Sequence, residues 1–139
     1  MLQYSLVSVR DDGTSNRVVM NGKEGRLGYS SVRLSYLTDG WIQLSGENNE
    51  DSNGWKLISE FILEPGTYTL TGMKGQQENT VALQMYIEDE WGNYRYLYQY
   101  DDDVQFTVDH FMNSSIHVRV YPTVKNVDVK ARPAVYRDE

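Results

Sequence analysis

The chain has 139 residues and no cysteine, so it is long enough to bury one hydrophobic core and has neither a disulfide framework nor a thiolate metal site. Its net charge is −7, and the acids gather in the middle, because residues 38–109 hold 14 acids and 3 bases. An acidic surface repels nucleic-acid phosphates, and no apolar run approaches the roughly 20 residues that span a bilayer. We therefore expect neither nucleic-acid binding nor membrane insertion.

The first 37 residues are the least regular part of the chain. Apolar residues alternate with polar ones over residues 2–6 and 32–36, which predicts short strands, and the glycine-containing segment from Asn21 predicts an exposed loop. We interpret residues 1–37 as an N-terminal extension or arm and residues 38–139 as one domain.

The next segment contains a hairpin signal. Asp39-Gly40 is the dipeptide typical of a tight hairpin turn, and Ile42 and Leu44 continue with two-residue alternation beyond it. A long polar loop follows from Gly46. Residues 55–63 are apolar on both faces, which favours a central strand or one that ends in a bulge, and places Trp55 in the core.

In most of the remaining chain, apolar and polar residues alternate with a period of two, and turn residues end each such segment. The clearest stretch is "EPGTYTLTG" from Glu64 to Gly72, where a Pro-Gly turn precedes Tyr68 and Leu70 on one face and threonines on the other. Further strands are predicted over residues 81–87, 94–100, 104–108, 116–120 and 127–131. Short strands at intervals of about ten residues predict an all-β fold, a jelly-roll β-sandwich of about 8–10 antiparallel strands.

Several of these residues follow the pattern of a known family. The pattern comprises the Asp39-Gly40 turn, Gly46, Leu63, Gly66, the run Tyr68-Thr69-Leu70-Thr71-Gly72, Phe106-Thr107, the row Ile116, Val118 and Val120, and a last strand closing at Pro133. Over about 95 residues, Asp39 to Val135, the chain resembles the jelly-roll domains of tailed-phage virion proteins, which are similar to carbohydrate-binding modules. The polar loop after Gly46 is longer and more acidic than that pattern, and residues 1–37 lie outside it.

The resemblance implies a non-enzymatic structural protein of a bacteriophage virion. Within the virion it implies an exterior accessory: a capsid decoration or head-fibre-like protein, or a baseplate or fibre tip. Residues 1–37 would dock on the particle, the partners would be other capsid or tail proteins and further copies of the chain, and the protein would reside in the virion, assembled in the host cytoplasm. The alternative is a free carbohydrate-binding module with no virion role.

The most pointed chemical feature is a row of tyrosines on one strand face: Tyr94, Tyr96, Tyr98 and Tyr100. The apolar C–H faces of sugars stack on aromatic rings, and tyrosine hydroxyls supply hydrogen bonds, so the row is suited to bind a host-surface glycan. Tyrosine is also enriched at protein interfaces. A half-buried strand whose aromatics pack across neighbouring strands is the third interpretation.

Other candidates are weaker. Trp91, in an acidic turn, is a candidate anchor for the same glycan or partner, and Trp41, next to a turn, suits either core or surface. The acidic clusters around Glu47, Glu88 and Asp101 lack calcium-loop spacing, and His110 and His117 accompany no nucleophile motif, although His117 is expected on the outward face of its strand. We expect no catalytic residues, no metal and no cofactor.

Overall fold

The computed structural model describes residues 22–28, 30–48, 53–122 and 124–138. Within these ranges the chain forms strands and loops, and none of its elements is a helix able to cross a membrane. The strands are β1 (Gly25–Arg26), β2 (Arg33–Tyr36), β3 (Ile42–Glu47), β4 (Gly54–Leu63), β5 (Gly66–Thr71), β6 (Val81–Glu88), β7 (Tyr94–Gln99), β8 (Val104–Val108), β9 (Met112–Val120), β10 (Asn126–Ala131) and β11 (Ala134–Asp138). The predicted all-β antiparallel sandwich is confirmed.

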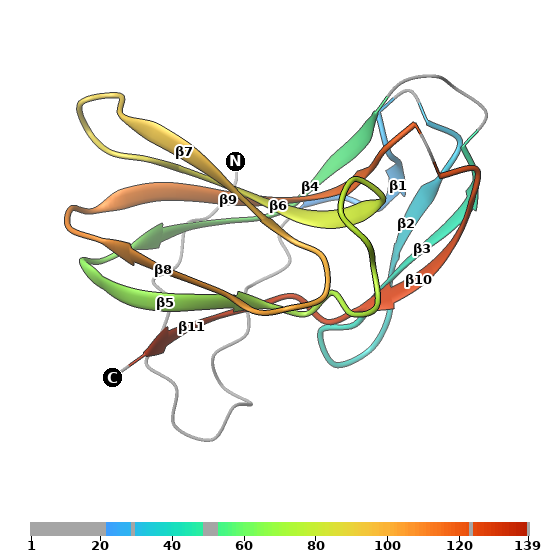
Figure 1. Ribbon diagram of the computed structural model, residues 1–139. Helices are drawn as coiled ribbons and strands as arrows, with labels where there is room; N and C mark the ends of the chain where they lie inside the picture. The colour runs from blue at the N-terminus through green and yellow to red at the C-terminus, as the bar shows by residue number, and fades with distance from the viewer. Residues whose placement is uncertain (1–21, 29, 49–52, 123, 139) are drawn as a thin grey trace.

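The strands form three antiparallel sheets, in the orders β4-β9-β6-β7, β11-β5-β8 and β1-β2-β3-β10. Figure 1 shows the three-stranded sheet lying across from the β4-β9-β6-β7 sheet, while the third sheet closes one end of the sandwich. β10 passes directly into β11 through Arg132 and Pro133, so one run of chain serves two sheets. Pro133 suits this corner because a proline cannot donate to a ladder.

The core is built from the alternating rows that the sequence predicts. Along β6, Val81, Leu83, Met85 and Ile87 are at most 1% exposed. The inward row of β9 and, from the facing sheet, Tyr68, Leu70 and Phe106 belong to the same hydrophobic cluster. Burying each such side chain contributes about 1.5–3 kcal/mol.

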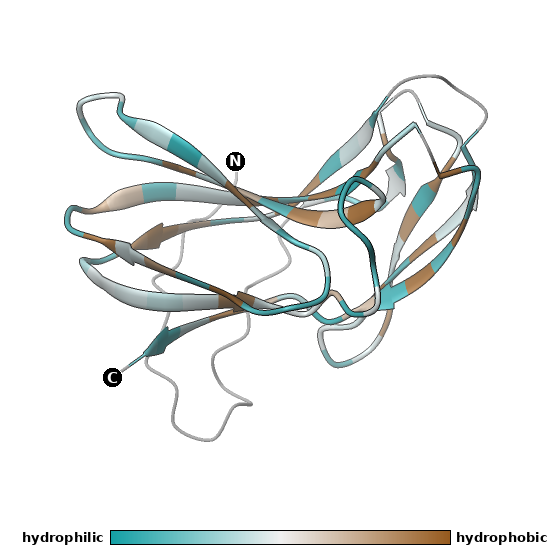
Figure 2. Cartoon of the chain, in the orientation of Figure 1, coloured by the Kyte–Doolittle hydropathy of each residue, from teal (hydrophilic) through white to brown (hydrophobic). Residues whose placement is uncertain are grey.

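The outermost strand β7 is less apolar than its neighbour β6. In Figure 2, β7 is mostly teal and white, whereas brown covers much of β6. The difference arises because β7 alternates tyrosines with a few inward residues, of which Leu97 is half-buried and Gln99 fully buried. Its tyrosines are therefore left on the outer face.

The Asp-Gly hairpin between β2 and β3 is confirmed. Asp39 and Gly40 have φ angles of 61° and 81°, and the Trp41 amide donates to the Thr38 carbonyl at 3.2 Å. Left-handed backbone at both central residues is the geometry of the tight turn that matches strand twist, and Asp and Gly tolerate it best.

Residues 22–37 contribute to the folded body. Leu34 of β2 pairs with Leu44 of β3, and Leu27, Val32 and Leu34 are at most 1% exposed. The boundary predicted after residue 37 therefore falls within a hydrogen-bonded hairpin. The rest of the predicted extension, residues 1–21, lies outside the described residues, as does the strand predicted over residues 2–6.

β4 is the last strand of its sheet among the described strands, and the Gly22 amide also donates to its Ile58 carbonyl at 3.1 Å. The bulge considered for this segment is present. The ladder with β9 shifts register between Leu57 and Ser59. Ile58 and Ser59 are both fully buried, which explains why this segment reads as apolar on both faces. The bulge also decides the face on which Trp55 lies.

Candidate functional site

The outward face of the β4-β9-β6-β7 sheet carries an unusual concentration of aromatic side chains. Because side chains alternate across a strand, the residues between the inward rows of β6, β7 and β9 all project outward. Register then sets them side by side: Tyr86 lies opposite both Tyr96 and Ser115, and Trp55 lies opposite Arg119. This face is therefore an ordered grid of aromatic and polar groups.

The grid is hollowed into an open groove of about 550 Å³, which we call the outer groove. Nine residues line it: Asn53, Trp55, Gln84, Tyr86, Tyr94, Tyr96, Ser115, His117 and Arg119. Four of the nine are tryptophan or tyrosine and five are polar, so the concave surface combines apolar ring faces with hydrogen-bonding groups, as ligand sites do.

One wall of the outer groove is a cluster of three tyrosines. The ring centroid of Tyr86 lies 5.6 Å from that of Tyr94 and 5.1 Å from that of Tyr96, and the Tyr94 and Tyr96 rings meet edge to face at 6.1 Å. These separations are within the favourable range for aromatic pairs, so each ring is held in place by its neighbours. A ligand meets a wall that is already ordered.

Trp55 forms the opposite side of the groove, on β4. Its side chain is 48% exposed, so the core position predicted for it is wrong. The physical reason is the bulge between Leu57 and Ser59, which shifts the alternation so that Trp55 lies on the outer face although Phe61 and Leu63 of the same strand are buried. Trp55 and the tyrosines thus face a ligand from two edges of one sheet.

The floor between these aromatics is polar and comes mainly from β9 and β6. The Arg119 Nη1 donates to the Gln84 Oε1 at 2.7 Å, and the guanidinium lies 4.7 Å from the centroid of the Tyr121 ring. Burial lowers the pKa of His117, while the nearby Glu60 raises it, and the net shift is downward. The imidazole is therefore neutral at neutral pH, which leaves Arg119 as the cation of the groove lining.

Tyr86 is oriented by an acid at the margin of the groove. Its hydroxyl donates to Glu88 Oε1 at 2.7 Å, and this hydrogen bond, with some burial, raises the pKa of Tyr86 to about 12. The residue is a neutral phenol throughout the physiological range, and its ring is fixed against Tyr94 and Tyr96.

The tyrosine row predicted from the sequence divides into three environments. Tyr94, Tyr96 and Tyr98 are exposed on the outer face, but the groove is lined by Tyr94 and Tyr96 alone among the four. Tyr98 stacks beside Tyr96 with centroids 6.4 Å apart. Tyr100 is half-buried, and its hydroxyl lies 3.1 Å from that of Tyr121.

Trp91 lies apart from the groove, at the tip of the β6–β7 hairpin. It is 63% exposed and contacts His110 edge-on, with ring centroids 4.8 Å apart. Asp89 holds this turn by accepting hydrogen bonds from the Trp91 and Asn93 amides, both at 2.9 Å. Burial raises the pKa of Asp89, but these hydrogen bonds outweigh it and the net shift is downward. Trp41 is also exposed, beneath Arg132.

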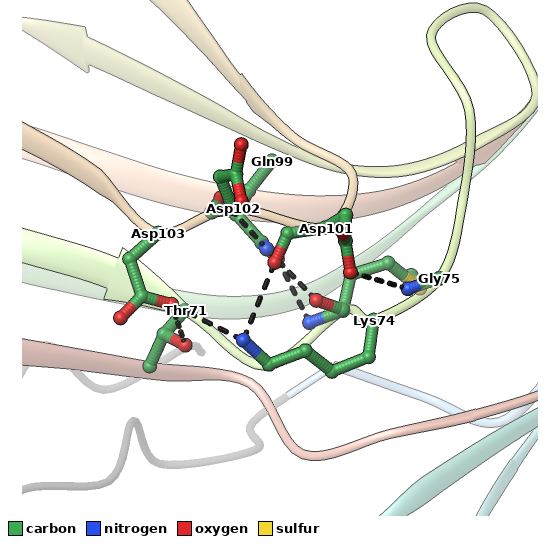
Figure 3. Close-up of polar contacts among 8 residues, drawn as sticks. Thr71, Lys74, Gly75, Gln99, Asp101, Asp102 and Asp103 are labelled. Atoms are coloured by element: carbon green, nitrogen blue, oxygen red, sulfur yellow. Dashed lines mark hydrogen bonds and ion pairs between the residues drawn. The ribbon is translucent and has the colours of Figure 1, made fainter.

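The acidic turn after β7 is a clamp between two loops (Figure 3). The buried Gln99 accepts from the Met73 amide and donates to the Met73 carbonyl, both at 2.8 Å. Asp101 Oδ1 accepts from the Gly75 amide at 2.7 Å, and Asp103 accepts from the Thr71 hydroxyl. We call Gln99, Asp101, Asp103 and their partners the Gln99 clamp. Across the described residues, no three metal-ligating side chains converge.

Sequence reasoning missed six groove residues: Asn53, Trp55, Gln84, Tyr86, Ser115 and Arg119. A signal for Tyr86 existed, because Tyr86 alternates with the inward residues Met85 and Ile87 and must point outward. The outward position expected for His117 agrees with the structure, where His117 lines the groove. The alternation pattern does not show which strands are neighbours in the sheet.

Comparison with solved structures shows a fold neighbour. The chain is similar to one in the crystal structure of accessory secretory protein 1, 2 and 3 in Streptococcus pneumoniae, with a TM-score of 0.51 and 14% sequence identity, over 91% of this chain and 99% of that chain. At this identity the likeness concerns the fold alone. No family model matches the sequence, and no curated protein matches it.

Proposed function

We propose that this protein is a non-enzymatic binding domain that recognises a glycan through the outer groove. The observation that carries the proposal is the facing arrangement of Trp55 and the Tyr86-Tyr94-Tyr96 cluster across a polar floor. Sugar rings have apolar faces that stack on such aromatic side chains, and hydroxyls that bond to a floor carrying amide, hydroxyl and imidazole groups.

Binding without cleavage is favoured by the groove lining. Glycoside hydrolysis commonly requires two carboxylic acids about 5–10 Å apart beside the scissile bond. None of the nine described lining residues is an aspartate or a glutamate. Ser115 and His117 line the same floor, yet the described contacts include no hydrogen bond between them, so a serine activated by a histidine is not supported.

The setting we propose is the exterior of a tailed-phage particle, as a capsid decoration or head-fibre-like protein, or a baseplate or fibre tip. Support for this setting is the sequence pattern from Asp39 to Val135, which resembles virion jelly-roll domains. In that setting the groove would contact a host-surface glycan, and other faces would contact virion proteins and further copies of the chain. Mass spectrometry of purified particles, with the solution mass of the isolated chain, tests the setting.

The binding function is tested by glycan-array screening, followed by titration calorimetry with the best ligand. We expect Trp55→Ala and Tyr96→Ala each to weaken binding about 30-fold, since a central aromatic anchor commonly contributes about 2 kcal/mol. Trp91→Ala is the matched control, because Trp91 is also an exposed aromatic residue but lies at the hairpin tip.

The outcomes separate the sites. Loss of binding in Trp91→Ala with none in Trp55→Ala would move the contact to the hairpin tip and overturn the groove. Absence of any bound glycan, together with oligomers that dissociate in Tyr96→Ala, would assign the tyrosine face to a protein interface. A monomer with saturable affinity that is absent from particles would indicate a free carbohydrate-binding module.

A further inference from the structure

We propose that the outer groove selects an anionic saccharide, one that carries a carboxylate or a sulfate, and that Arg119 recognises the charged group. This inference rests on the proposed glycan-binding function and adds the chemical class of its ligand. The observations that lead to it are the charge state of the groove floor and the polar atoms there that have no partner.

Arg119 holds an uncompensated positive charge at the floor. Its described contacts are a hydrogen bond to the neutral amide of Gln84, 2.7 Å long, and the face of the Tyr121 ring. No carboxylate among the described residues forms an ion pair with Arg119, in contrast to Arg132 and Arg137, which pair with Asp39 and Glu64 at 2.7 Å and 3.0 Å. A guanidinium held by neutral partners in a groove is suited to an anion from outside the chain.

Polar atoms without partners are concentrated at this floor. Five enclosed side-chain nitrogen or oxygen atoms of the described residues lack a hydrogen bond, and three of them belong to groove residues: Asn53 Oδ1, His117 Nδ1 and Arg119 Nε. Native proteins rarely leave such groups unpaired, and each exception calls for a reason. A ligand that draws the Arg119 side chain toward the groove would give its Nε–H an acceptor and use the planar fork in a bidentate contact.

The surrounding acids do not cancel this charge. Glu88, next to the groove, accepts the Tyr86 hydroxyl at 2.7 Å, and Glu60 lies near His117, but neither lines the groove. The chain's net charge of −7 acts from a distance and is screened beyond about 8 Å at physiological ionic strength. Selectivity for an anion therefore depends on the local floor rather than on the whole molecule.

The test uses the full chain on an array of neutral, uronate-containing, sialylated and sulfated glycans, with calorimetry on the best acidic ligand and on its charge-free analogue (methyl-esterified or desulfated). We expect the charged ligand to bind at least about tenfold more tightly than the analogue, and its affinity to fall as salt is raised. Array arms that carry a carboxylate or a sulfate identify which anion is preferred.

Variants sharpen the test. Arg119→Gln should weaken the acidic ligand about tenfold or more and leave the analogue nearly unchanged. Arg95→Gln is the matched control, because Arg95 lies on β7 with its guanidinium bonded to the Thr107 carbonyl, outside the groove lining. Arg119→Lys keeps the charge and loses the planar guanidinium, so its affinity for the acidic ligand should lie between those of the wild type and Arg119→Gln.

The inference and the function on which it rests fail differently. Equal affinity for the charged ligand and its analogue would overturn the proposed selectivity for an anionic saccharide and leave the proposed glycan binding intact. An unchanged affinity for the acidic ligand in a folded Arg119→Gln protein would have the same consequence. Absence of binding to every glycan overturns the proposed function and the inference together. If Arg119→Gln does not fold, the comparison of ligand and analogue on the wild-type chain still decides.

Discussion

The outer groove and the Gln99 clamp are both polar clusters beside the same sheet, yet they differ in how their hydrogen bonds are used. In the clamp, Gln99 bonds both backbone groups of Met73, Asp101 accepts from the Gly75 amide, and Asp103 accepts from the Thr71 hydroxyl at the end of β5. In the groove, three enclosed polar atoms have no partner and an arginine has no carboxylate. A cluster that satisfies itself holds loops together, whereas one left unsatisfied is suited to bind a ligand.

A glutamine in each cluster gives the sharpest test of this difference. Gln99→Ala should lower the free energy of unfolding by about 3 kcal/mol, because it leaves the buried Met73 amide and carbonyl unpaired. Gln84→Ala, the matched change in the groove, should cost less than about 1 kcal/mol and instead weaken ligand binding. Urea unfolding and calorimetry measure the two effects. Similar stability losses for both variants would contradict the distinction.

A smaller effect is expected at the edge of the clamp. Asp101→Ala removes the acceptor of the Gly75 amide hydrogen bond, which is 2.7 Å long and exposed. We expect a loss of about 1 kcal/mol in the free energy of unfolding, with ligand affinity unchanged. Asp102→Ala is the control, since the Asp102 backbone carbonyl takes part in the clamp and its side chain has no described contact there. A change in ligand affinity would link the clamp to the groove.

The groove should give the protein a weak dependence of stability on pH. Burial lowers the pKa of His117 in the folded state, with Glu60 opposing the shift, so the unfolded chain binds the proton more readily. The contribution of His117 to the free energy of unfolding is therefore fully present above about pH 6.5, the ordinary pKa of histidine, and is lost as the pH falls below it toward the folded pKa. The slope of the unfolding free energy against pH corresponds to the uptake of at most one proton on unfolding. The difference in unfolding free energy between wild type and His117→Gln should change over this window. A constant difference would contradict the assignment.

The smallest effect is expected for Tyr100. Its hydroxyl lies 3.1 Å from that of Tyr121, away from the groove lining. Tyr100→Phe should cost about 0.5 kcal/mol of stability and leave glycan affinity unchanged. Tyr98→Phe, at an exposed position beside Tyr96, is the comparison for an outward tyrosine without a described hydroxyl partner. Reduced affinity in Tyr100→Phe would extend the binding face along the whole predicted tyrosine row.

Much of this architecture was predictable because it is local. Two-residue alternation assigns Leu83 to the core and Tyr96 to the outer face without knowledge of any partner strand, and the φ preferences of Asp39-Gly40 predict its turn. The same rule applied to β6 would have placed Tyr86 outward. The error at Trp55 is of another kind, because the six apolar residues among positions 55–63 do not reveal where the bulge lies, and the bulge decides which face Trp55 takes.

Sequence alone determined most of the strands, their turns and the buried face of regularly alternating strands such as β6, because those properties depend on neighbours two to four residues away. Tertiary structure decided the strand order β4-β9-β6-β7, which joins segments about 65 residues apart in the chain, such as Trp55 and Arg119. That order alone brings Trp55, Tyr86 and Arg119 onto one face. Register between distant strands is set by the fit of the whole core, and no local pattern contains it.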